Sequence, residues 1–79
     1  MKAIVHVGLK PGVLDPQGKA VADTLGRMGY DEVRSARIGK VIELDLEGVE
    51  AGQEEARVKE MCEKLLANTV IESYRIEVL

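Results

Sequence analysis

Residues 8–20 read Gly-Leu-Lys-Pro-Gly-Val-Leu-Asp-Pro-Gln-Gly-Lys-Ala and connect a predicted strand to a predicted helix. The Pro-Gly pair at positions 11–12 is typical of a bend in the chain. Asp15 followed by Pro16 indicates a helix start, because the carboxylate accepts a free N–H of the first turn and proline there loses no hydrogen bond. The pair at 13–14 is apolar, although connections usually carry solvated polar residues. We therefore predict an ordered connection that also offers a contact surface.

The stretch before this connection predicts a strand over residues 2–9. Both of its faces are largely apolar, with Ala3, Val5 and Val7 on one and Ile4 on the other. A strand of this kind is expected at the centre of a sheet, or where another subunit covers the second face.

The stretch after the connection predicts a helix from Pro16 to about Met28. Val21, Leu25 and Met28 recur at helical spacing, and Gly29 stands where a left-handed cap is expected. Apolar spacing likewise predicts a second helix over residues 52–67.

Three further strands are expected, two of them joined in a hairpin. Residues 33–40 and 41–47 are predicted to pair through a two-residue turn at Gly39-Lys40, which would place Arg37 on the apolar side, reaching the sheet edge or a partner. Residues 70–78 form the last predicted strand. The order β-α-β-β-α-β predicts an α+β fold, a ferredoxin-like two-layer sandwich with a four-stranded antiparallel sheet and two helices on one face.

The composition bounds the size of the core and the classes of partner. Seventy-nine residues make one domain, spanning residues 1–79, with no Trp or Phe, two tyrosines, one cysteine and one histidine. A single cysteine excludes an internal disulfide, and so small a core predicts stabilisation by self-association or by a partner. A net charge of −3 with interspersed signs argues against nucleic acid, and no apolar run reaches bilayer length, so we expect a cytoplasmic protein.

Candidate residues for chemistry are few. His6 lies in an apolar strand without an orienting partner, and Cys62 lies on the apolar stripe of the second helix, so we expect neither to be catalytic. Lys10 and Lys19 flank a helix start that could meet a phosphate, but Asp15 occupies the cap and repels anions. No metal site is expected.

Three motifs together are more specific. LKPGVLDPQGKA at 9–20, RIGK at 37–40 and EMCEKLLAN at 60–68 closely resemble the PurS family, and the resemblance covers essentially the whole chain. Proteins of this family are small subunits of phosphoribosylformylglycinamidine synthase, an amidotransferase of purine biosynthesis. The family pattern has proline after the asparagine of the third motif, where this chain has Thr69, so a different local turn geometry is expected there.

The resemblance implies a required but non-catalytic subunit of a glutamine-dependent carbon–nitrogen ligase. It implies assembly as an adaptor with the ATP-dependent synthetase subunit PurL and the glutaminase subunit PurQ, and a homodimer or a dimer of dimers. The complex would convert formylglycinamide ribonucleotide, glutamine and ATP into formylglycinamidine ribonucleotide, with ammonia passing between subunits. ATP and Mg²⁺ would be used by the synthetase subunit, and this chain would bind no cofactor.

The site residues expected by this interpretation are contact residues on three segments of the chain. They are Lys10, Pro11, Asp15, Pro16, Gln17, Arg37, Gly39, Lys40, Leu66, Asn68, Ile71 and Tyr74. An alternative class stays open, because domains of the predicted fold commonly pair and bind metabolites between copies. That alternative is a dimeric regulatory module that binds a small molecule. An acylphosphatase-like enzyme is disfavoured, because the strand–helix turn carries Lys10 and Asp15 and no arginine.

Overall fold

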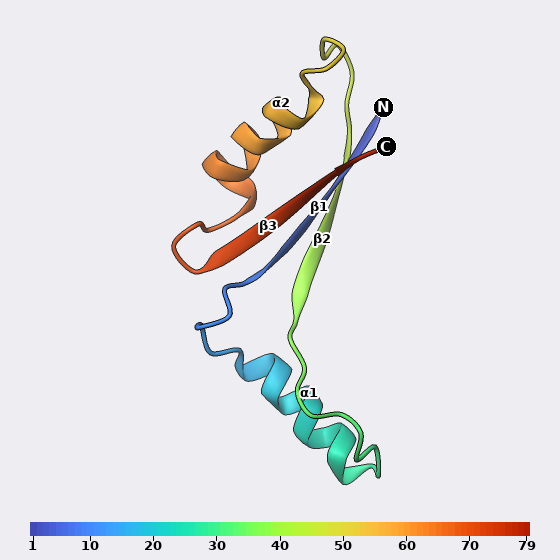
Figure 1. Cartoon of the computed structure of the whole chain (residues 1–79), viewed down its shortest axis with the longest axis vertical. Helices are drawn as coiled ribbons and strands as arrows, with labels where there is room; N and C mark the ends of the chain where they lie inside the picture. Colours follow the sequence, from blue (N-terminus) through green and yellow to red (C-terminus); the bar gives the residue numbers. More distant parts are fainter.

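The chain is described by a computed structural model that covers all 79 residues (Figure 1). Its elements, in order, are β1 (Lys2–Leu9), α1 (Pro16–Arg27), β2 (Gly39–Asp45), α2 (Glu54–Met61), the π-helical turn η1 (Cys62–Leu66) and β3 (Glu72–Val78). The first strand and both helices therefore lie where the sequence predicts them, and β3 begins two residues later than expected.

The three strands form one antiparallel sheet in the order β2-β1-β3. The central place of β1 agrees with its two largely apolar faces. Gly8 pairs with Gly39 on one side and with Ser73 on the other, and Leu9 pairs with Glu72. The carboxyl end of β1 and the amino ends of β2 and β3 therefore meet at the same end of the sheet.

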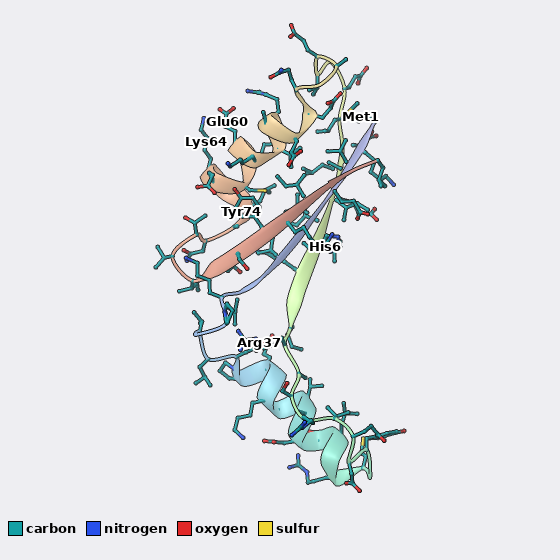
Figure 2. All side chains as sticks on the ribbon, viewed as in Figure 1. Met1, His6, Arg37, Glu60, Lys64 and Tyr74 are labelled. Carbon is teal, nitrogen blue, oxygen red and sulfur yellow. The ribbon has the colours of Figure 1, made fainter.

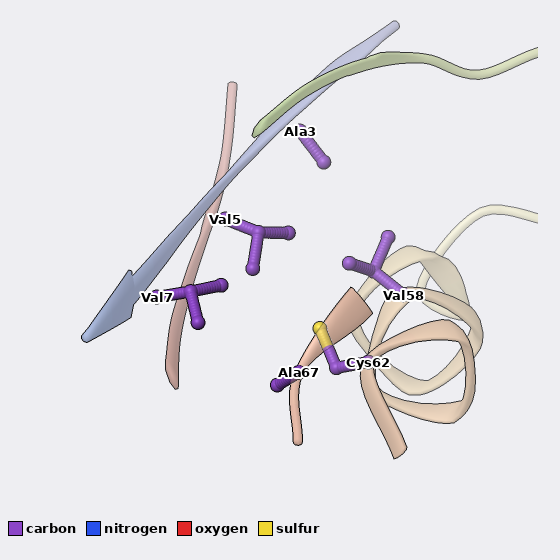
Figure 3. Close-up of a cluster of buried hydrophobic side chains, with 6 residues drawn as sticks. All are labelled: Ala3, Val5, Val7, Val58, Cys62 and Ala67. Atoms are coloured by element: carbon purple, nitrogen blue, oxygen red, sulfur yellow. The ribbon is translucent and has the colours of Figure 1, made fainter. Parts of the chain in front are cut away.

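A small core lies between this sheet and α2 (Figure 3). Its buried apolar residues are Ala3, Val5, Val7, Val58, Cys62 and Ala67. The β1 residues come from the face predicted to be inward, and Val58 and Cys62 come from the stripe predicted on the second helix. Only eight of the 79 residues are buried, so this core is thin even for a small domain.

The first helix does not lie on the sheet. Together with the returning residues 28–38 it forms an arm that extends beyond the sheet end (Figure 1). We call α1 with residues 28–38 the arm. The radius of gyration is 16.0 Å, with extents of 50 × 24 × 14 Å, whereas a compact domain of this length has a radius of gyration of about 12 Å. The prediction of two helices on one face of the sheet is therefore wrong for the isolated chain.

The predicted hairpin is also wrong, and the sheet has three strands instead of four. Gly39 and Lys40 make no turn, because they pair with Gly8 and Val7 as the first residues of β2. Residues 33–38 run beside α1, with Val33 and Ala36 half-buried. The glycine at 39 is needed for another reason. A Cβ at this position would collide with the carbonyl oxygen of Val7.

The arm nevertheless has well-formed ends. Asp15 is the N-cap of α1 and Pro16 is its first residue, as predicted. At the other end Gly29 has a φ of 97°, and the N–H groups of Gly29 and Tyr30 donate to the carbonyls of Gly26 and Leu25. This is the Schellman arrangement that a left-handed glycine allows. No helix of the structure is both long and apolar enough to cross a bilayer.

Candidate functional site

The three predicted contact segments converge on the end of the sheet from which the arm leaves. We call this region the junction and define it as residues 8–18, 36–40 and 66–74. Its first and third segments are joined directly, because the backbone N–H of Lys10 donates to the carbonyl of Ile71 at 2.9 Å. The sheet register brings the second segment alongside, since Gly39 pairs with Gly8.

Asp15 is the residue that ties the arm together at the junction. One carboxylate oxygen accepts the N–H of Gly18 at 2.8 Å, and the other accepts the N–H of Ile38, also at 2.8 Å. The residue is 6% exposed. The hydrogen bonds from Ile38 and Gly18, with Arg37 nearby, hold the pKa of the Asp15 carboxyl below its usual value despite its burial. Asp15 therefore caps α1 and at the same time fastens the returning strand to it.

Arg37 provides a second fastening on the other side. Its guanidinium donates to the carbonyl of Lys10 at 2.9 Å and lies 3.4 Å from that of Leu9 (Figure 2). The side chain thus satisfies backbone acceptors where β1 leaves the sheet. Arg37 was predicted on a strand; it lies instead in the extended segment before β2, and it does reach the sheet end.

The arm segments are packed closely enough to need glycine at one position. A Cβ on Gly18 would overlap the carbonyl oxygen of Ala36, and the residue is buried in the first turn of α1. This contact explains a glycine that otherwise lowers the helix propensity of the first turn. It also shows that residues 36–38 are held against α1 over more than one contact.

The segment between η1 and β3 forms a compact turn. The side-chain oxygen of Asn68 accepts the N–H of Val70 at 3.2 Å. The backbone carbonyl of Asn68 accepts the N–H groups of Ile71 and Glu72. In return the Glu72 carboxylate accepts the N–H of Asn68 at 2.7 Å. Thr69 lies inside this turn, which therefore closes without the proline of the family pattern.

Tyr74 anchors β3 to the end of the second helical region. Its hydroxyl donates to the Glu63 carboxylate at 2.6 Å, and Figure 2 shows the ring pointing from β3 toward that helix. The bond to Glu63, with burial as a lesser cause, raises the pKa of Tyr74 to about 12. Glu63 belongs to η1, and π-helical turns of this kind recur at functional sites.

Two hollows open on the junction. One, of about 280 Å³, lies between the sheet end and the start of α1 and includes Asp15, Gln17, Lys40 and Glu72. The other, of about 580 Å³, lies between Pro11 and Arg37. The largest hollow, of about 640 Å³, lies elsewhere, between the end of β2 and α2, where Asp45, Glu47 and Glu50 line it. None of the predicted contact residues lines that one.

The structure thus brings most of the predicted site residues to one region. Seven of them line the two hollows or make the hydrogen bonds that hold the junction together: Lys10, Pro11, Asp15, Gln17, Arg37, Gly39 and Lys40. Leu66 packs against the core, and Pro16 begins the helix. Sequence reasoning did not include Ile38, Glu63 or Glu72 among the site residues, whereas the glycine at 18 was expected to permit close packing. The i, i+4 spacing of Asn68 and Glu72 was the one local signal that could have indicated the turn.

The two residues weighed above as catalytic candidates, Cys62 and His6, lie in the core and on the sheet. Cys62 is fully buried in the core, and burial raises the pKa of its thiol. His6 lies on the opposite sheet face, where its ring nitrogen is 3.4 Å from a carboxylate oxygen of Glu77.

Comparison with known proteins agrees with the motifs. The PurS family model, described as phosphoribosylformylglycinamidine (FGAM) synthase, matches residues 2–79. The subunit PurS of phosphoribosylformylglycinamidine synthase from Bacillus subtilis is 57% identical over 77 residues, which cover 98% of this chain and 90% of the relative.

Solved structures agree as well. A crystal form of Bacillus subtilis PurS superposes with a TM-score of 0.85 at 56% identity, covering 96% of this chain and 94% of that one. A chain in the structure of PurLQS from Thermotoga maritima superposes with a TM-score of 0.88 at 32% identity, covering 99% and 95%. The elongated shape is therefore shared with solved relatives, and the chain belongs to the PurS family.

Proposed function

We propose that this chain is the small, non-catalytic subunit of a cytoplasmic phosphoribosylformylglycinamidine synthase. It assembles with a synthetase subunit, PurL, and a glutaminase subunit, PurQ, as an adaptor in purine biosynthesis. The observation that carries the proposal is the match of 99% of the chain, at a TM-score of 0.88, to a chain in the structure of PurLQS. In this complex ATP and Mg²⁺ serve the synthetase subunit, and the small subunit supports the transfer of ammonia from the glutaminase.

The geometry of the junction fits an adaptor role. Two of its charged side chains, Asp15 and Arg37, are engaged with backbone groups that hold the arm in place. These two side chains position the backbone, and the surface around them remains available for contacts with a partner. An adaptor needs a surface of fixed shape more than it needs a reactive group, because preorganisation lowers the cost of association.

A reconstitution experiment tests this function. Purified synthetase and glutaminase subunits from the same organism are assayed for glutamine-dependent formation of formylglycinamidine ribonucleotide, with and without this chain. We expect strong activity only when the chain is present, whereas activity with added ammonium ions, which bypasses the glutaminase, should depend on it less. Full glutamine-dependent activity without the chain would overturn the proposal and favour the metabolite-binding module.

We also propose that the layer of two helices predicted from the sequence is completed between two copies of the chain. The apolar side of α1 faces solvent along a hollow of about 290 Å³ lined by Ala20, Val21, Thr24 and Leu25. On the sheet, Ile42 and Leu44 of β2 stay half-buried, because α2 contacts β3 and packs its buried residues on those of β1.

The apolar side of α1 and the incompletely covered sheet face at β2 thus belong to the same chain but do not contact each other. A reciprocal exchange of arms across a two-fold axis would cover both at once. The accessible surface of 5863 Å² exceeds that of a compact monomer of this mass by about 1,200 Å². An excess of this size is comparable to the roughly 800 Å² that each partner buries in a stable interface.

Sedimentation of two variants tests the exchange. Val21→Asp places a carboxylate on the exposed apolar side of α1 and should weaken the dimer at least about tenfold. Lys19→Asp, on the polar side of the same helix, replaces an exposed ion pair with Asp23 by an exposed like-charge pair, a change of only a few tenths of a kcal/mol, and should leave the dimer unchanged. A monomeric wild-type chain at micromolar concentration would contradict the exchange.

A further inference from the structure

Apolar side chains are exposed on two connections of the junction, where polar residues are usual. In the β1–α1 connection Leu14 is 75% exposed, and in the turn before β3 Val70 is 80% and Ile71 is 40% exposed. Val13 beside Leu14 is half-buried. We call these four residues the apolar tip. Neighbouring exposed apolar residues on separate loops mark contact sites more often than single ones do.

The two halves of the apolar tip are held together at their base. The N–H of Lys10 donates to the carbonyl of Ile71, and the carbonyl of Lys10 accepts the N–H of Val13, both at 2.9 Å. Arg37 donates to the same Lys10 carbonyl. The apolar tip is therefore fixed before any partner binds, which reduces the ordering entropy that binding costs.

The charge around the apolar tip indicates the chemistry of its partner. Lys10 lies in the first connection and Lys40 lines the adjoining hollow, and neither is part of an ion pair. Glu72, the one acid of the second turn, lines the same hollow as Lys40 and accepts the backbone N–H of Asn68. The contact between copies is already assigned to the apolar side of α1, on a different part of the chain. A second copy is thus a poor occupant.

We propose that the apolar tip docks on a different protein chain, in an apolar recess flanked by carboxylates that pair with Lys10 and Lys40. This inference rests on the proposed function, because the occupant would be one of the two larger subunits of the complex. It assigns the apolar tip to that contact and the apolar side of α1 to the contact between copies. The two surfaces can therefore be disabled separately.

Two variants with one matched control test the assignment. Leu14→Asp and Val70→Asp each change a side chain that is at least three-quarters exposed, so the fold should persist. Leu79→Asp is the control, because Leu79 is 64% exposed at the opposite end of the sheet, where its N–H donates to the carbonyl of Lys2. Titration calorimetry measures binding to the purified synthetase and glutaminase subunits, and sedimentation measures the dimer.

We expect Leu14→Asp and Val70→Asp to weaken binding to one larger subunit about 30-fold or more. The control should bind like the wild type, and all three variants should stay dimeric. Lys10→Glu should weaken binding in the calorimeter, and its affinity should depend less on salt than that of the wild type. Wild-type affinity in both tip variants would overturn this inference while leaving the proposed function intact. Loss of the dimer in those variants would assign the tip to self-association instead. A wild-type chain that binds neither subunit would overturn both proposals.

Discussion

The carboxylate of Asp15 accepts the backbone N–H of Ile38, 23 positions along the chain, at 2.8 Å. The same carboxylate caps α1 through Gly18. A residue that reads in the sequence as an ordinary helix cap thus also sets where β2 begins, because Ile38 immediately precedes the first paired residue, Gly39. Asp15 therefore helps to set the path of the arm relative to the sheet, together with Arg37.

Replacing Asp15 with alanine should lower the melting temperature by about 5 °C or more, because two backbone N–H groups lose their acceptor. Asp23→Ala is the matched control, since Asp23 makes only an exposed i, i+4 pair with Lys19. Differential scanning calorimetry compares the two variants. Equal melting temperatures would show that the Asp15 bonds do not contribute to stability.

Stability should fall in acid, and Asp15 should account for part of the fall. Because the folded pKa of Asp15 is below its value of 3.8 in the unfolded chain, its stabilising contribution is fully present above that value. It is lost as pH falls through the folded pKa. Urea unfolding from about pH 6 to pH 2 should therefore show a shallower decline for Asp15→Asn than for the wild type.

Glu60 offers a control for this pH dependence. Its pKa is also lowered, chiefly by the hydrogen bond from Lys64, but the pair is exposed. Exposed pairs of this kind contribute little, so Glu60→Gln should follow the wild-type curve closely. A variant of Glu60 that flattened the curve as much as Asp15→Asn would contradict the special role of Asp15.

Two glycines of α1 should respond to alanine in opposite directions. Gly18→Ala would drive a methyl group into the carbonyl of Ala36 and should destabilise the chain by about 1–3 kcal/mol. Gly26 has open space around its Cβ position, so Gly26→Ala should stabilise the helix by up to about 1 kcal/mol. Chemical denaturation of both variants measures the difference. A stabilising Gly18→Ala would mean that residues 36–38 do not pack on α1 in solution.

Tyr74 should titrate late. In a Tyr30→Phe background Tyr74 is the only tyrosine, and ultraviolet absorbance should report a pKa of about 12. Glu63→Gln removes the carboxylate that is the main cause, so the pKa should fall toward 10.0, the ordinary value. An unchanged pKa in that variant would show that the contact between β3 and η1 is absent in solution.

Local elements were predictable from the sequence because local chemistry determines them. A run of apolar and β-branched residues identified β1, and Asp15, Pro16 and Gly29 marked both ends of α1. The hairpin prediction was wrong because the glycine at 39 is required by a contact with another strand. It allows close approach to Val7, and its neighbour Ile38 bonds to Asp15. Both relationships join distant parts of the chain, and spacing within a short window carries no information about them.

The candidate site was predictable in its residues but not in its arrangement. The apolar pair at 13–14 and the Arg37 motif indicated contact surfaces without indicating that they meet. Their convergence follows from the register of β1 with its two neighbours, which places Gly8, Gly39 and Ser73 side by side. A one-residue slip of β2 or β3 against β1 would have turned the side chains of that strand to the other face of the sheet.

Residue 38 leads directly into β2 without a turn, and this connection bears on the proposed exchange of arms. Had residues 39–40 formed a turn, the arm could have folded back on its own sheet and the chain could have remained single. Lengthening this connection, for instance by an Asn-Gly insertion after Gly39, gives the chain the slack to close on itself. The number of copies in the assembly would then be set by the length of one connection, independently of the residues that form the contact between the copies.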